Sequence, residues 1–266
     1  MVYGYDGFSI SLVLLIVFYN FVTMIDWFKR LRQRRGFGVH SPFMFHLITE
    51  VIGERRLYYR YYDIELIRQQ LLLKEDTIVL PSNSGTGTIA KVVEREGIRP
   101  KRGALLFRLT NYFQPDRILQ IGPTTGLSTL YLSSYKPELT CVSLETIPEY
   151  TPISRWVYEK GARTAIDLQA GDCQTTLPPA LERLGKVDFV YFNTWSKTSP
   201  LWLFDTCLKY AHNETVFVFE GIRVNKQMRV FWETVCEHPE ISTSIDLYST
   251  GIVLFNKNLH KQNYRI

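Results

Sequence analysis

The sequence predicts an α/β protein with a Rossmann-like, doubly wound sheet of seven strands, a C-terminal antiparallel hairpin and an N-terminal helical extension. A short apolar run at 118–121 predicts a strand buried on both faces, and the glycines at 122 and 126 bracket a tight turn into a helix. Strands and helices then alternate, which favours a parallel sheet. The last two predicted strands, 241–247 and 252–255, are joined too closely for a parallel crossover and must be antiparallel.

Composition sets broad limits on the class of protein. At 266 residues the chain is long enough for one large domain, or one domain with an extension. Its 45% hydrophobic and 21% charged residues are typical of a globular protein with a sizeable core. The net charge of +5 is small and concentrated near the N-terminus, so nothing indicates a nucleic-acid partner. The 4 cysteines are far apart and favour reduced thiols in a cytosolic compartment.

The N-terminal segment predicts a membrane anchor. Residues 8–25 are 18 residues without a charge, and as a helix they would span about 27 Å. Five basic residues follow between 29 and 35, which would leave the main domain in the cytoplasm, tethered to the inner membrane. Two alternatives stay open for residues 1–28: a helix of the core, or an untranslated extension with Met24 as the start.

Residues 29–113 predict a helical cap. Ser41 and Pro42 are a typical helix N-cap and first residue, and further helices are expected at 61–73 and 105–113. His40 beside that cap has no obvious partner, so we expect it to be structural. Between these helices, a short strand and a Gly-x-Gly loop at 85–87 imitate a nucleotide fingerprint. No acid closes that pattern, so the loop is interpreted as a turn or a lid.

The central motif indicates a nucleoside site. A second apolar strand, 139–144, ends on Glu145, 23 residues after Gly122. Strand, glycine turn, helix, strand and acid form one nucleotide-binding half of a doubly wound sheet. The glycines let the backbone approach a ligand, and the carboxylate can accept hydrogen bonds from two ribose hydroxyls.

The rest of the chain continues the alternation. After helix 148–160 and strand 165–168, Asp172 precedes a helix at 174–184 that we expect to be interrupted at Pro178 and Pro179. Asp172 is either a ligand or an N-cap. Further predicted elements are a strand at 187–192 ending before Asn193, a helix at 201–210, a strand at 215–219 ending before Glu220, and a helix at 226–236.

From about residue 35 to its end, the sequence resembles the class I S-adenosylmethionine (SAM)-dependent methyltransferases, specifically the small O-methyltransferase-like proteins of Bacteroidetes-type bacteria. The motifs that carry the resemblance are Gly36-Phe-Gly-Val-His-Ser-Pro-Phe43, Leu105-Leu-Phe-Arg-Leu109, 118–132 around the glycine turn, 187–192 and 245–252. The glycine turn is shared by the whole superfamily. The resemblance implies a SAM-binding domain over residues 114–266.

The resemblance also implies roles for individual residues. Gly122, Thr124 and Gly126 would line the methionine part of the cofactor, Glu145 would hold the ribose and Asp172 the adenine amino group. Asn193 and Glu220 would line the acceptor side as candidate catalytic residues.

Departures from the family pattern weaken a metal site. Relatives carry an acid where this chain has Gln120, another in place of Asn193, and Asp-Asp in place of Glu220-Gly221. Hard divalent cations prefer carboxylate oxygens, so we expect no tightly bound metal.

Three functions remain open from the sequence. The first is SAM-dependent O-methyl transfer to a small hydroxyl-bearing acceptor without tight metal. The second is a non-catalytic relative that binds SAM or S-adenosylhomocysteine (SAH) as an assembly module, because the acids are lost. The third is an NAD-dependent oxidoreductase, which the terminal hairpin disfavours. The sequence does not determine the acceptor or the oligomeric state.

Overall fold

The central sheet confirms the doubly wound α/β architecture. The computed structural model describes residues 24, 28, 30–81, 85–193 and 198–266. In these residues, eight strands form one sheet in the order β10-β8-β9-β7-β6-β3-β4-β5. They are β3 (Arg117–Ile121), β4 (Thr140–Glu145), β5 (Asp167–Ala170), β6 (Phe189–Phe192), β7 (Val216–Glu220), β8 (Thr243–Asp246), β9 (Thr250–Leu254) and β10 (Gln262–Arg265).

Strand directions place a topological switch point at β3. Strands β3 to β7 are mutually parallel, and the chain goes from β3 to β4 and β5 on one side, then to β6 and β7 on the other. Strand β9 inserts antiparallel between β7 and β8, which confirms the predicted hairpin. In such sheets, ligands bind at the carboxyl ends of the strands beside the switch point.

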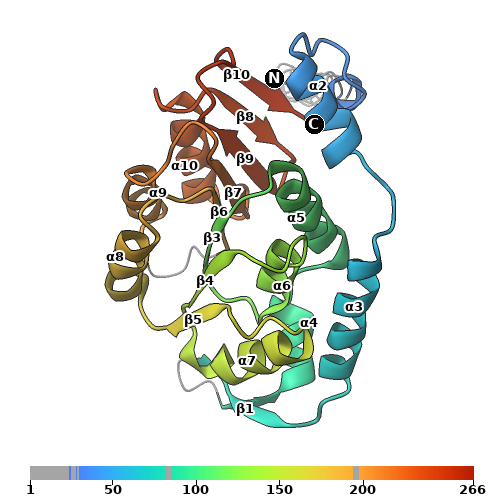
Figure 1. Ribbon diagram of the computed structural model, residues 1–266, viewed down its shortest axis with the longest axis vertical. Helices are drawn as coiled ribbons and strands as arrows, with labels where there is room; N and C mark the ends of the chain where they lie inside the picture. Colours follow the sequence, from blue (N-terminus) through green and yellow to red (C-terminus); the bar gives the residue numbers. More distant parts are fainter. Residues whose placement is uncertain (1–23, 25–27, 29, 82–84, 194–197) are drawn as a thin grey trace, which may run out of the picture.

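Helices cover both faces of the sheet and bury two cores (Figure 1). On one side lie α8 (Cys173–Leu184), α9 (Pro200–Leu208) and α10 (Lys226–Glu237). On the other lie α3 (Tyr59–Leu72), α4 (Ile89–Glu96), α5 (Pro100–Phe113), α6 (Leu127–Ser133) and α7 (Thr151–Lys160). Side chains alternate between the faces, so Ile118 packs in one core and Leu119 in the other.

The N-terminal part is helical, as predicted. Ser41 caps α2 (Pro42–His46), where its hydroxyl accepts a hydrogen bond from the Met44 amide at 3.4 Å. The helix continues as a π-helix, η1 (Leu47–Ile52). The interpretation of the Gly-x-Gly loop as a turn or a lid is wrong, because Gly87 lies inside β2 (Thr86–Thr88), which pairs antiparallel with β1 (Thr77–Val79).

Several predicted boundaries are wrong. The sheet has an eighth strand, β10, parallel to β8 at the edge. Strand β5 lies at 167–170 instead of 165–168, and α5 begins at Pro100 instead of Leu105. Helix α8 runs through its two prolines without a break.

The four cysteines are free and buried, as predicted. The candidate anchor, 8–25, lies almost wholly outside the described residues. In the part of the chain that the structure describes, no helix combines the length and the apolar composition needed to span a membrane.

Candidate cofactor site at the switch point

The conformation of the glycine turn after β3 depends on Gly126. Gly126 has φ of 82°, and a Cβ there would stand 2.9 Å from Cβ of Val157. Its amide donates to Oγ1 of Thr124 at 2.8 Å. The glycine is therefore required twice, for a left-handed backbone and for the close approach of α7. Gly122 also has a positive φ, 112°.

Glu145 at the end of β4 turns its carboxylate toward this turn. Its Oε2 accepts a hydrogen bond from the Thr124 amide at 3.3 Å, and its Oε1 accepts one from the Ile147 amide at 3.0 Å. The side chain is 1% exposed. Burial raises the pKa of Glu145 to about 7, and the two amide hydrogen bonds oppose that rise. The sequence-predicted carboxylate and turn are thus in direct contact.

A neutral hydrogen-bond network lies beneath the turn. The amide of Gln120 donates from Nε2 to the Gly122 carbonyl at 3.0 Å, and its Oε1 accepts from the Ser143 hydroxyl at 2.7 Å. The same oxygen accepts from the Thr129 hydroxyl at 3.2 Å, and the Tyr158 hydroxyl donates to Ser143 at 3.0 Å. An amide fits this buried place because it both donates and accepts without introducing a charge.

Three buried hydroxyls lie close in sequence to the glycine turn and to Glu145. Ser128 on the first turn of α6, Thr146 directly after Glu145 and Thr151 at the start of α7 have buried hydroxyl oxygens. None has a hydrogen-bond partner among the described residues. A buried hydroxyl without a partner costs about 1–3 kcal/mol, so a polar ligand at this place would relieve the cost. Each of these hydroxyls can both donate to and accept from such a ligand.

Asp172 is at the same edge of the sheet, and it caps a helix. The amide of Gly171, beside it, donates to the Glu145 carbonyl at 3.0 Å. Oδ1 of Asp172 accepts a hydrogen bond from the Gln174 amide at 2.7 Å, at the start of α8, and the Asp172 side chain is exposed. The capping alternative is what the structure shows. The exposed carboxylate still has lone pairs for a further donor.

Asn193 lies directly after β6 and contacts the glycine turn. Its Nδ2 donates to the Pro123 carbonyl at 2.7 Å, which ties the end of β6 to the glycine turn. The four residues after Asn193 lie outside the described part of the chain. Asn193 therefore positions the turn, and it contributes no negative charge.

Glu220 at the end of β7 is held by an ion pair that the sequence did not reveal. Its Oε1 accepts from Nη1 of Arg102 on α5, and its Oε2 accepts from the Thr250 hydroxyl at 3.0 Å. Arg102 also donates to the Ser249 hydroxyl at 2.9 Å. Burial raises the pKa of Glu220, and the Arg102 cation and the Thr250 hydroxyl work against it.

The ends of β6 and β7 together carry a single carboxylate, that of Glu220. In the pairing of β6 with β7, Phe192 lies opposite Phe219, so the residues that follow them, Asn193 and Glu220, lie at the same edge of the sheet. The carboxylate there is already neutralised by a guanidinium, and Gln120 and Asn193 are uncharged. No group of three or more His, Cys, Asp and Glu residues with metal-binding geometry occurs in the described ranges.

Neither a scan against models of protein families nor a search of curated proteins gives a match. Solved structures do match. An O-methyltransferase from Bacillus cereus in complex with SAH is 18% identical, with 79% of this chain and 96% of that one covered and a TM-score of 0.57. An O-methyltransferase of tomaymycin synthesis from Streptomyces achromogenes, in complex with SAM, is 18% identical, with 75% and 91% covered and a TM-score of 0.55.

A third match is an SAH-bound methyltransferase from Podospora anserina. It is 14% identical, with 96% of this chain and 98% of that one covered and a TM-score of 0.56. At such identities the likeness concerns the arrangement of strands and helices. The chain has the Rossmann-like fold of the SAM-dependent O-methyltransferases.

Proposed function

We propose that this protein is a SAM-dependent methyltransferase that transfers a methyl group to a hydroxyl of a small acceptor without a tightly bound metal. The observation that carries the proposal is the contact of the Glu145 carboxylate with the glycine turn at the switch point. The O-methyltransferases that share the fold are described with SAM or SAH bound, which supports the same cofactor here.

In this proposal each cofactor group meets a residue of matching chemistry. Glu145 accepts hydrogen bonds from the ribose hydroxyls, and Asp172 accepts one from the adenine amino group. Gly122, Thr124 and Gly126 bring the backbone close to the methionine part. When bound, SAM supplies an electrophilic methyl group.

The acceptor side works mainly by positioning. Asn193 fixes the turn through the Pro123 carbonyl, and Glu220 is held by Arg102 and Thr250. Holding a nucleophile in line with an electrophile can supply a large part of the rate. Burial makes the Glu220 carboxylate a stronger base than an exposed one, and the Arg102 cation limits that gain, so Glu220 can take the acceptor proton.

A second candidate function is a non-catalytic SAM-binding module. The specific observation in its favour is that both candidate catalytic side chains are already engaged within the protein. Gln120 in the neutral network points the same way. An NAD-dependent oxidoreductase is disfavoured, because β9 stands antiparallel in the sheet, whereas dinucleotide-binding domains are usually built from two parallel mononucleotide-binding halves.

Thermal unfolding with SAH, SAM and NAD tests the cofactor. At 100 times its dissociation constant, a ligand adds about 2.7 kcal/mol to the free energy of unfolding. We expect SAH and SAM to raise the Tm and NAD to leave it unchanged. Glu145→Ala should remove the shift, and Glu159→Ala, an exposed acid on α7, should keep it. Stabilisation by NAD alone would refute the proposal.

Methyl transfer is tested separately from binding. The full-length chain with methyl-labelled SAM and a panel of catechols, phenols and aliphatic alcohols should give labelled product, and EDTA should not reduce the rate. Glu220→Gln should lower kcat more than the affinity for SAH. Tight SAH binding with no product from any acceptor would favour the binding module.

A further inference from the structure

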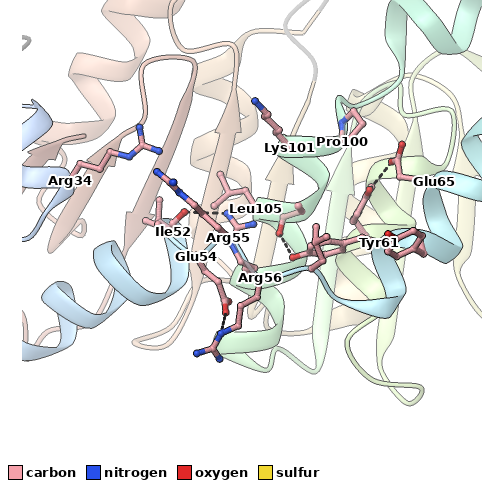
Figure 2. Close-up of a pocket in the computed structure, with 16 residues that line it drawn as sticks. Arg34, Ile52, Glu54, Arg55, Arg56, Tyr61, Glu65, Pro100, Lys101 and Leu105 are labelled. Atoms are coloured by element: carbon pink, nitrogen blue, oxygen red, sulfur yellow. Dashed lines mark hydrogen bonds and ion pairs between the residues drawn. The ribbon is translucent and has the colours of Figure 1, made fainter.

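A cavity lies away from the switch point. It has a volume of about 760 Å³ and is enclosed by α3, α5, the loop 53–57 between η1 and α3, and Arg34 (Figure 2). Neither Glu145 nor Glu220 lines it. Sites for small ligands typically enclose roughly 300–1,000 Å³, so this cavity has the size of a ligand site.

Positive charge dominates its lining. Five cations face two acids: the cations are Arg34, Arg55, Arg56, Lys101 and Arg108, and the acids are Glu54 and Glu65. Both acids are engaged. Glu54 pairs with Arg56 at 3.5 Å, while Glu65 pairs with Arg68 at 2.9 Å and accepts from the Tyr131 hydroxyl at 2.7 Å.

Three of the cations have no counter-charge. Arg34, Arg55 and Lys101 form no ion pair with any described residue, and all three are exposed at the rim. Cations lining one concave surface concentrate the electric field there and attract anions.

Arg108 adds a cation in the wall. Its guanidinium donates to the Val51 carbonyl at 2.7 Å and to the Ile52 carbonyl at 3.1 Å, and the residue is half-buried. Carbonyl groups fix its position but carry no net charge. A partly buried guanidinium held in this way is better satisfied when an anion lies near it.

The remaining wall is apolar. Tyr61, whose hydroxyl donates to the Ala104 carbonyl at 3.1 Å, and Leu105 are buried beside Ala104. At the mouth, Leu57 is 76% exposed and Tyr62 is 64% exposed. Apolar side chains left in water beside a cationic rim suit a ligand that has both an acidic group and an apolar body.

We propose that this cavity binds an anionic amphiphile, with its carboxylate or phosphate among the rim cations and its apolar body against Tyr61 and Leu105. The ligand class can come from two sources: a free acid in solution or an anionic lipid of a bilayer. The cavity site does not depend on the methyltransferase proposal, and the tests below need no SAM.

Calorimetric titration of the full-length chain tests the ligand class. The probes are octyl phosphate below its micelle concentration, inorganic phosphate and octyltrimethylammonium. We expect octyl phosphate to bind at least tenfold more tightly than either of the others, and its affinity to fall with added salt. Equal affinity for inorganic phosphate, or tighter binding of the cationic probe, would overturn the proposal.

Variants locate the binding. Arg55→Glu with Lys101→Glu reverses two exposed charges, so folding should persist, and octyl phosphate affinity should fall at least tenfold. Ala104→Trp fills the cavity and should also abolish binding. Arg229→Glu reverses an exposed charge on α10, away from the cavity, and should leave the affinity unchanged. An equal loss in Arg229→Glu, or none in the double charge variant, would overturn the site.

Vesicle sedimentation separates the two sources. The same variants are mixed with vesicles of phosphatidylcholine alone or with one third phosphatidylglycerol. Binding to the anionic vesicles that the double charge variant loses and Arg229→Glu keeps would identify a bilayer lipid. Octyl phosphate binding without such vesicle binding would identify a free acid.

Discussion

At the scale of the residue, burial keeps the Glu145 carboxyl protonated to a higher pH than water would. Its carboxylate has two amide donors but is shut away from solvent, and the outcome is a pKa of about 7 against an ordinary value of 4.5. Desolvation outweighs the hydrogen bonds. A ribose would add two hydroxyl donors, so cofactor binding in the proposed site favours the ionised form.

The raised pKa predicts how stability depends on pH. Between pH 4.5 and about 7 the folded protein keeps a proton on Glu145 that the unfolded chain has lost. Stability should therefore fall as the pH rises through this window, by about 3 kcal/mol from this group. Glu145→Gln should flatten the decline in urea unfolding experiments at pH 4.5 to 8. An unchanged slope in the variant would show that the carboxyl is not responsible.

Substitution of Gly126 should reduce the free energy of unfolding more than substitution of a turn glycine that has open space around it. Gly126→Ala forces an L-residue to φ of 82° and sets its Cβ 2.9 Å from Val157, so we expect a loss of about 3 kcal/mol. Gly185→Ala is the matched control, because φ is 71° there and no atom lies within 4 Å. It should cost about 1 kcal/mol from strain alone. Equal losses in urea unfolding would contradict the packing argument.

At the scale of the element, sequence periodicity identified buried strands well and polar ones poorly. Strands β3, β4, β6 and β7 are apolar and lie within about two residues of prediction. The added edge strand β10 is Gln-Asn-Tyr-Arg, and only Tyr264 is buried, so no apolar run marks it. Its pairing with β8 is a tertiary effect that local pattern does not encode.

The predicted interruption of α8 at its two prolines is wrong. Pro178 and Pro179 remove the amides that would donate to the carbonyls of Gln174 and Thr175. Those two residues are exposed in the first turn, where water can satisfy their carbonyls, so the helix continues. At α5 the opposite holds, because Pro100 begins the helix.

The contacts of Glu220 on β7 with Arg102 on α5 and Thr250 on β9 predict that Arg102 and Glu220 are coupled energetically. Arg102→Met removes the guanidinium that pairs with the buried Glu220 carboxylate, and should cost about 2 kcal/mol. This figure allows for solvent screening, since the Arg102 side chain is 39% exposed and that of Glu220 is 12% exposed. Glu220→Gln in the same chain should recover most of the loss. A double-mutant cycle from urea unfolding measures the coupling, and additive losses would argue against it.

At the scale of the whole molecule, the sequence predicted which residues meet at the end of the sheet but not the partners that their side chains have there. Gly122, Thr124, Gly126 and Glu145 meet because parallel strands end at one edge, which the motif encodes. Arg102 joins Glu220 across 118 residues of sequence, and no local pattern records that contact. The engaged state of Asn193 and Glu220 was likewise hidden, because hydrogen-bond partners are set by tertiary packing.

The closed surroundings of the switch point predict that the proposed cofactor reaches its site slowly. Glu145 and Thr124 are each 1% exposed and Thr125 is 0% exposed, so SAH can reach them only after neighbouring side chains move aside. If opening precedes binding, the observed rate must approach a plateau as the SAH concentration rises. We expect this plateau in stopped-flow tryptophan fluorescence, with Trp156 on α7 as the reporter and Trp156→Phe as the check on the signal. Asp172→Ala changes an exposed contact and should alter the affinity while leaving the plateau rate unchanged. A rate that rises linearly to the highest concentration, for a ligand whose binding is seen at equilibrium, would mean that the site is already open in solution.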